Sequence, residues 1–160
     1  MMELPAPTPR PREALIRVFA STINIDDIHV AEGTFYGGIP LGARPRRNRP
    51  VTPGSDVSGV VIGVGPEVRS LRVGDAVFGV QIPFRPGGAW ARAAAIYERW
   101  LTPKPGNLSF GTAAACGVSG LVAESAIQAL RLRPQLRLVV VGASGGIGGM
   151  AVQLAARAGA

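Results

Sequence analysis

The stretch that decides the fold is Val139-Val140-Val141-Gly142-Ala143-Ser144-Gly145-Gly146-Ile147-Gly148-Gly149. The apolar, β-branched run from Leu136 to Val141 predicts a short strand buried on both faces of a parallel sheet. Apolar residues then recur at helical spacing and predict a helix that Gly159 would cap. This stripe consists of Ile147, Ala151, Leu154 and Ala158. The stretch therefore has the order strand, glycine turn, helix.

A glycine turn between a strand and a helix is typical of phosphate binding. It directs free backbone N–H groups and the positive end of the helix at one point. In the pattern G-x-G-x-x-G, Ala143 takes the tight turn, Gly145 the approach to pyrophosphate and Gly148 the contact between helix and strand. The pattern G-x-x-x-G-x-G fits as well, through Gly142, Gly146 and Gly148. The motif alone does not choose between the two frames or exclude a turn without a ligand. The predicted cofactor-binding residues are Gly142, Ala143, Ser144, Gly145, Gly146, Ile147 and Gly148.

Length and composition limit the classes of protein that the chain can belong to. With 160 residues, 47% of them hydrophobic, it can form one good core but is short for two complete domains. The sequence has no apolar run long enough to cross a bilayer and no signal peptide, so we expect a cytoplasmic location and no membrane partner. Cys116 is the one cysteine, which excludes an internal disulfide or a cysteine zinc cluster.

The net charge of +7 raises the alternative of a nucleic-acid-binding protein. The basic cluster of the chain, however, lies in a proline-interrupted loop without aromatic neighbours that could stack on bases. This cluster consists of Arg44, Arg46, Arg47 and Arg49. It is more typical of a solvated loop, and we expect no nucleic-acid partner.

The order of elements predicts two domains. Strands are predicted at Glu13–Ala20, Val57–Val64 and Ala76–Val80, and the Gly/Pro turns between them favour a small all-β barrel. Two helices follow, at Gly111–Cys116 and at Leu121–Leu130, the second capped by Ser119. The boundary between domains is therefore expected near residues 110 to 120, and we place it between residues 115 and 116.

Four stretches of the chain together resemble the medium-chain dehydrogenase/reductase superfamily, in its zinc-independent quinone-oxidoreductase-like branch. They are residues 53–61, 73–79, 110–115 and 139–160. The resemblance implies a mixed fold: a GroES-like β-barrel, residues 1–115, followed by the first strand and helix of an α/β Rossmann doubly wound sheet, residues 116–160. It also implies NADPH or NADH as the cofactor. The implied reaction is hydride transfer to a small-molecule carbonyl compound, quinone, enone or enoyl thioester, with homodimer formation left open.

The resemblance also indicates site residues and no metal. Zinc-dependent relatives have a cysteine where Asn24 stands and a histidine–glutamate pair where Ser55 and Asp56 stand, so that of the zinc ligands only Cys116 matches. One such ligand does not hold zinc. Without zinc, the reacting oxygen needs hydrogen-bond donors, and Asn24 is the candidate.

Two neighbouring residues have weaker indications. His29 aligns with a histidine that relays protons in alcohol dehydrogenases. A loop histidine bonded to nearby backbone is the alternative interpretation. Asp27 is expected to order its own loop.

Members of this superfamily normally continue for about the length of another domain. We therefore expect a truncated gene, a fragment or half of a split enzyme, and we expect the 160-residue chain by itself to be inactive. The alternative is a non-catalytic remnant or interaction module of the same fold, which would expose an unpaired sheet edge to a partner.

Overall fold

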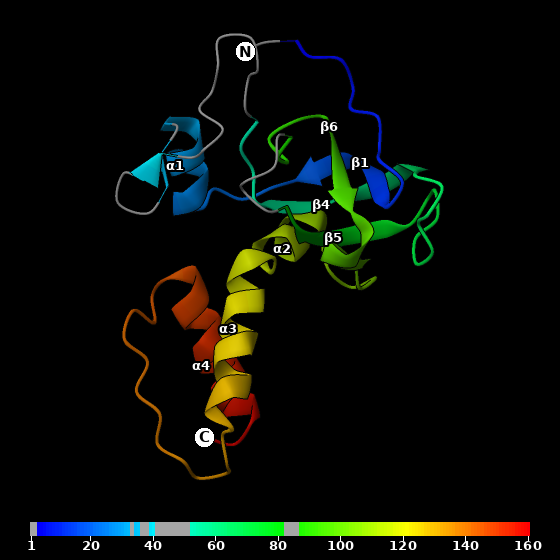
Figure 1. Ribbon diagram of the computed structural model, residues 1–160. Coiled ribbons are helices and arrows are strands. Elements are labelled where there is room, and N and C mark those ends of the chain that lie inside the picture. The colour runs from blue at the N-terminus through cyan, green and yellow to red at the C-terminus, as the bar shows by residue number, and fades with distance from the viewer. Residues whose placement is uncertain (1–2, 33, 36–38, 41–51, 82–86) are drawn as a thin grey trace. The chain divides into compact units, whose positions relative to one another are not determined.

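The computed structural model describes residues 3–32, 34–35, 39–40, 52–81 and 87–160 (Figure 1). The chain forms two compact units, Met1–Ala114 and Ala115–Ala160. The predicted loop cluster of Arg44, Arg46, Arg47 and Arg49 lies outside the described residues. In the part that is described, no helix is both long and apolar enough to cross a membrane.

The first unit is built on a five-stranded antiparallel sheet with the strand order β6-β1-β4-β5-β7. Its strands are β1 (Glu13–Ala20), β4 (Asp56–Val64), β5 (Ala76–Val80), β6 (Ala93–Tyr97) and β7 (Leu101–Pro103). A separate pair joins β2 (Thr34–Phe35) to β3 (Ile39–Pro40). The three predicted strands are confirmed, and β4 begins one residue earlier than predicted. The alanines of β6 gave no strand signal, because alanine has low β-propensity.

The core of this unit comes from alternate residues of the sheet strands. In β1, Ile16 is fully buried while Arg17 and Phe19 face outward, as the alternation in the sequence predicts. The largest fully buried apolar side chains are Ile16, Ile96, Val57, Val61 and Val77. Full burial of one such side chain contributes about 1.5 to 3 kcal/mol. The apolar pattern of the strands therefore accounts for most of the stability of the sheet.

Short helices flank the sheet: α1 (Ile25–Glu32), the 3-10 helix η1 (Glu98–Trp100) and α2 (Phe110–Ala115). The ring of Phe110, at the start of α2, stacks on the ring of Phe19 in β1, with centroids 4.7 Å apart. Arg17 lies over the Phe19 ring and Lys104 over the Phe110 ring. The aromatic pair and its cations therefore attach α2 to the outer face of β1.

The second unit contains the helices α3 (Val118–Leu130) and α4 (Gly146–Arg157), which pack side by side (Figure 1). The predicted Ser119 cap is wrong: the N-cap of α3 is Gly117, and Ser119 lies in the first helical turn. A Cβ added to Gly146 would lie 2.7 Å from the Ser119 hydroxyl oxygen. Ser119 therefore faces the start of α4, where it cannot accept the N–H groups of its own helix.

The predicted strand at Leu136–Val141 is wrong. Residues 136–141 form no strand, and Val139 and Val141 are 85% and 94% exposed. A strand needs a neighbour for its N–H and C=O groups, and no described segment pairs with this run. The predicted helix is confirmed: α4 ends at Arg157, and Gly159 follows with a φ of +83°. Ala155 is its buried residue, whereas the predicted Ala158 is exposed.

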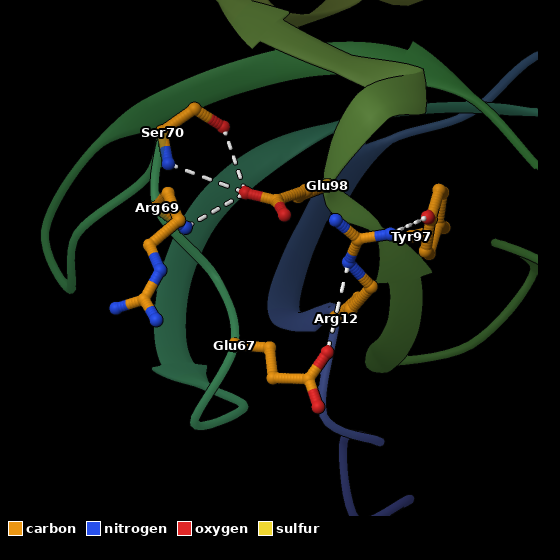
Figure 2. A network of polar contacts seen from close by, with 6 residues as sticks. All are labelled: Arg12, Glu67, Arg69, Ser70, Tyr97 and Glu98. Carbon is orange, nitrogen blue, oxygen red and sulfur yellow. Dashed lines mark hydrogen bonds and ion pairs between the residues drawn. The ribbon is translucent and has the colours of Figure 1, made fainter.

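A polar network ties the loop after β4 to the end of β6 (Figure 2). Glu98 Oε2 accepts hydrogen bonds from the backbone N–H of Arg69 at 2.9 Å, from that of Ser70 at 3.2 Å and from the Ser70 hydroxyl at 3.0 Å. The pKa of Glu98 lies below its ordinary value, mainly because the backbone N–H groups of Arg69 and Ser70 donate to its carboxylate. The Ser70 hydroxyl and the charge of Arg12 lower the pKa further, while burial opposes the shift without reversing it. The ionised form of Glu98 therefore stabilises this loop.

This shift predicts an acid-side loss of stability. A carboxyl whose pKa is lowered by folding contributes its full stabilisation above its ordinary pKa of 4.5 and loses it as the pH falls through the lowered folded pKa. We expect Glu98→Gln to flatten the fall of Tm below that pH, and Ser70→Ala to give an intermediate slope. Thermal unfolding of the 160-residue chain in a series of acidic buffers measures both. Parallel curves for the three proteins would contradict the assignment.

Candidate functional site

The predicted site residues of the first unit gather where β1 ends and β4 begins. Asn24 precedes α1, and Asp27 in the first turn of α1 accepts a hydrogen bond from the Asn24 backbone N–H at 2.8 Å. The Asp27 N–H in turn donates to the Asn24 carbonyl at 3.0 Å. The arrangement resembles one half of a capping box, in which the third helical residue reaches back to the N-cap. It fixes the backbone of Asn24.

The other carboxylate oxygen of Asp27 binds the two residues that precede β4. Asp27 is only 1% exposed, and its Oδ1 accepts hydrogen bonds from Gly54 N at 3.1 Å, Ser55 N at 2.8 Å and Ser55 Oγ at 2.6 Å. Burial of a carboxylate is costly unless donors surround it, and four donors do so here. The prediction that Asp27 orders its loop is confirmed, and its contacts also extend to the start of the next long strand.

A second cluster surrounds the Asn24 side chain. Its Nδ2 donates to Asp56 Oδ2 at 2.9 Å and to Thr22 Oγ1 at 3.1 Å. The Thr22 hydroxyl donates in turn to the same Asp56 oxygen. Asp56 is 1% exposed, and its backbone carbonyl accepts a 2.7 Å hydrogen bond from Ser21 Oγ. Asn24, Thr22 and Asp56 therefore form a closed triangle of hydrogen bonds.

The segment from Gly88 to Trp90 supports this region from outside the helix. The N–H groups of Ala89 and Trp90 donate to the carbonyls of Gly54 and Pro53, both at 2.9 Å, and Trp90 Nε1 donates to the Thr22 carbonyl at 2.8 Å. Gly54 has a φ of +111°, and a Cβ added there would lie 2.6 Å from the Ala89 nitrogen. A glycine is therefore required at this point of the Pro-Gly-Ser-Asp sequence.

The two residues next to Asn24 in the chain have exposed apolar side chains. Ile23 and Ile25 are 75% and 66% exposed, while Asn24 itself is half-buried. Exposed apolar side chains beside a polar group are typical of a site for a largely apolar ligand.

The position of His29 is set by α1. It lies on α1, half-buried, with its Nδ1 3.9 Å from Glu32 Oε2. Among the described residues, no hydrogen bond joins His29 to Asn24. The structure thus brings Asn24, Ser55 and Asp56 together, and a proton-relay role of His29 remains a prediction.

The described part of the chain contains no group of three His, Cys, Asp or Glu side chains that could hold a metal ion. Ser55 Oγ is bonded to Asp27, and the Asp56 carboxylate is bonded to Asn24 and Thr22. Cys116 belongs to the second unit. The residues at the zinc positions of other superfamily members therefore have structural hydrogen bonds here.

The glycine turn leads into α4. Gly142 has a φ of +81°, its carbonyl accepts the Gly145 N–H at 3.0 Å, and Gly145 is the N-cap of the helix. A Cβ on Gly148 would overlap the Gly142 carbonyl oxygen. The tight turn is thus made at Gly142, as in the frame G-x-x-x-G-x-G, and Gly148, which both frames share, permits the close contact between helix and turn.

The turn leaves backbone donors open. The first N–H groups of a helix have no acceptor within it, and those of α4 belong to Gly146, Ile147 and Gly148. Residues 142–147 are exposed. This arrangement is suited to a phosphate, although cofactor binding by these residues remains a prediction.

Thr22 and Trp90 were missed by the sequence analysis. Thr22 lies 34 residues from Asp56, and Trp90 lies 68 residues from Thr22. A threonine near an asparagine indicates only local turn hydrogen bonds. No local sequence pattern indicates either of these long-range contacts.

Comparison with known proteins agrees with this architecture. Residues 10–127 match the alcohol dehydrogenase GroES-like domain, and the chain belongs to this family, within the quinone-oxidoreductase-like branch of the medium-chain dehydrogenase/reductase superfamily. The chain is 33% identical to the chloroplast envelope quinone oxidoreductase homolog of Arabidopsis thaliana, over 96% of this chain and 46% of that protein. It is 32% identical to the quinone oxidoreductase of Pongo abelii, over 96% of this chain and 44% of that protein.

Solved structures of similar proteins share the fold. The quinone oxidoreductase from Coxiella burnetii has a TM-score of 0.84 at 29% identity, over 98% of this chain and 48% of that one. The quinone oxidoreductase from Thermus thermophilus, also solved as a complex with NADPH, has a TM-score of 0.75 at 30% identity, over 99% of this chain and 46% of that one. The chain spans about half the length of the curated relatives it matches.

The contacts of Asp27 predict that even a substitution of similar shape at this position lowers the stability of the chain strongly. In Asp27→Asn, one acceptor oxygen becomes an NH2 group that faces backbone N–H donors. We expect the free energy of unfolding to fall by about 2 to 3 kcal/mol, since hydrogen bonds to a charged group are strong and the site is buried. Asp26→Asn, one residue earlier in the same helical turn, should cost less than about 1 kcal/mol. Urea unfolding measures both, and equal losses would contradict the role of Asp27.

Proposed function

We propose that this chain is part of an NAD(P)H-dependent oxidoreductase that reduces quinones, enones or enoyl thioesters by hydride transfer and without zinc. The observation that carries the proposal is the open glycine turn at α4, in a chain similar along nearly its whole length to a quinone oxidoreductase solved with NADPH. The bound nicotinamide cofactor supplies the hydride. The proposed substrate partner is a small molecule.

Each proposed role belongs to a described residue. The N–H groups of Gly146, Ile147 and Gly148 hold the cofactor pyrophosphate. Asn24 donates a hydrogen bond to the substrate oxygen, on which negative charge develops as the hydride arrives. Ile23 and Ile25 keep water from the apolar part of the substrate. NADPH and NADH both fit these roles, because the residue that distinguishes them follows a later strand of a doubly wound fold.

We expect the purified chain to carry no stoichiometric zinc. Zinc in a catalytic site needs three protein ligands, and Asn24, Ser55 and Asp56 are bonded to other residues. Elemental analysis after dialysis against a weak chelator measures the content. Retention of about one zinc ion per chain would refute the zinc-free assignment.

The reductase proposal predicts quinone-dependent oxidation of NADPH by a full-length form that contains this chain. The 160-residue chain alone should show none, because the ribose and adenine contacts belong to later strands.

The second prediction concerns the turnover of the full-length form. Loss of one oxyanion donor costs about a hundredfold in turnover, so we expect Asn24→Ala to lower the turnover by about that factor. Asn107→Ala, at an exposed asparagine far along the chain, is the matched control and should leave the rate unchanged.

The absorbance of NADPH follows the reaction with a quinone, an enone and an enoyl thioester in turn. A full-length form that oxidises NADPH with none of the three would refute the proposed function. An unchanged rate in Asn24→Ala would remove Asn24 from it while leaving the reductase assignment intact.

A non-catalytic interaction module is the second candidate, favoured by the exposure of Val139 and Val141. An apolar run of this kind is suited to pair with another strand. Under this candidate the full-length form would bind no nicotinamide cofactor, and calorimetry with NADPH measures this binding.

Formation of a homodimer and a cytoplasmic location are also part of the proposal. One of the relatives compared is a chloroplast protein.

A further inference from the structure

The hydrogen bonds of Asn24 fix which way its carboxamide points. The atom 2.9 Å from Asp56 Oδ2 has to be the nitrogen, because an amide oxygen there would face a carboxylate oxygen without a proton between them. The nitrogen also lies 3.1 Å from Thr22 Oγ1. The hydroxyl of Thr22 has one proton, which it gives to Asp56, so that it accepts from Asn24.

The two acceptors lie on the same side of the Asn24 nitrogen. Thr22 Oγ1 and Asp56 Oδ2 are bonded to each other. Two oxygens at an ordinary hydrogen-bond separation, each about 3 Å from a nitrogen, subtend an angle of roughly 50° at that nitrogen. The two N–H bonds of a carboxamide diverge by about 120°, since the group is planar. One N–H is therefore shared between both acceptors, and the other points away from them.

We propose that Thr22 and Asp56 are positioning residues, which hold the Asn24 carboxamide so that one N–H remains available to a hydrogen-bond acceptor of a bound molecule. Among the described residues, no hydrogen bond occupies that second N–H. The chemical class of the acceptor, a carbonyl or quinone oxygen, rests on the proposed function. The orientation of the carboxamide does not.

Each member of the triangle is itself held in place. Asp27 binds the Asn24 backbone N–H, Trp90 Nε1 binds the Thr22 carbonyl, and Ser21 Oγ binds the Asp56 carbonyl. Asp56 is buried at the first position of β4. A donor that is already oriented loses little conformational freedom when a substrate binds, so the triangle prepares Asn24 for its role.

Side-chain amide NMR of the 160-residue chain tests the orientation without any cofactor. Rotation about the amide bond is slow, so the two Nδ2 protons of Asn24 give separate signals. We expect one of them to exchange with water at least about tenfold more slowly than the protons of exposed Asn107, and the other to exchange at the rate seen for Asn107. Two Asn24 protons that both exchange like those of Asn107 would overturn the proposal.

Substitutions separate the triangle from the general stability of the region. Thr22→Val removes one of the two acceptors with little change of shape and should speed the slow exchange several-fold, whereas Asp56→Ala, if that variant folds, should abolish the slow exchange. Thr22→Ser should restore it. Ser58→Ala, two residues further along β4, removes a hydrogen bond to the Val77 carbonyl and none within the triangle, so it is the matched control and should leave the slow exchange unchanged. An exchange rate in Thr22→Val equal to that of the unaltered chain would overturn the positioning role of Thr22 even if Asp56→Ala does not fold.

Kinetics of the full-length form provide the second readout. A misoriented donor weakens the stabilisation of the transition state alone, so Thr22→Val should lower kcat about tenfold and leave KM for NADPH within about twofold of its original value. In Thr22→Ser, kcat and KM should both stay within about twofold of their original values. An inactive full-length form would refute the proposed function and leave the NMR result standing. An active form whose kcat does not change in Thr22→Val would overturn the positioning role alone.

Discussion

The site depends on one buried carboxylate, that of Asp27. A charge with 1% of its surface exposed is tolerated only where donors replace the lost water, and here all the donors are backbone or side-chain groups of two distant segments. The carboxylate therefore needs the start of α1 and the start of β4 at the same place. Neither segment can move without leaving part of the charge unsatisfied.

This constraint sets the positions of the neighbouring polar residues. Asn24 precedes Asp27 by one helical turn, and Asp56 follows the Ser55 that Asp27 binds. Once Asp27 fixes both backbones, the side chains of Asn24 and Asp56 come within hydrogen-bond distance. The positions that the resemblance aligns with the zinc ligands of zinc-dependent relatives thus belong to a polar network, which joins the loop before α1 to the start of β4.

The sequence predicted the parts of the fold that depend on local pattern. Alternation identified β1, and apolar spacing identified α4, because both are properties of neighbouring residues. The Ser119 cap failed because the hydroxyl faces another helix, and the strand at residues 136–141 failed because pairing is not a local property. For the site, the structural role of Asp27 was predictable, and Asn24 was a candidate that the sequence already offered. The part played by Thr22 was not, since its partner Asp56 lies 34 residues away.

The contact between Gly148 and the Gly142 carbonyl has a consequence for the kinetics of the anion binding that is proposed for this turn. With no side chain between them, the first turn of α4 rests directly on the loop that precedes it, so direct backbone contact supports the shape of the loop. A binding loop that is supported in this way loses little entropy on association and needs no slow rearrangement. Its encounter with an anion should be limited by diffusion and by ionic strength. A side chain at position 148 would overlap the Gly142 carbonyl oxygen and should slow this encounter by changing the shape of the turn.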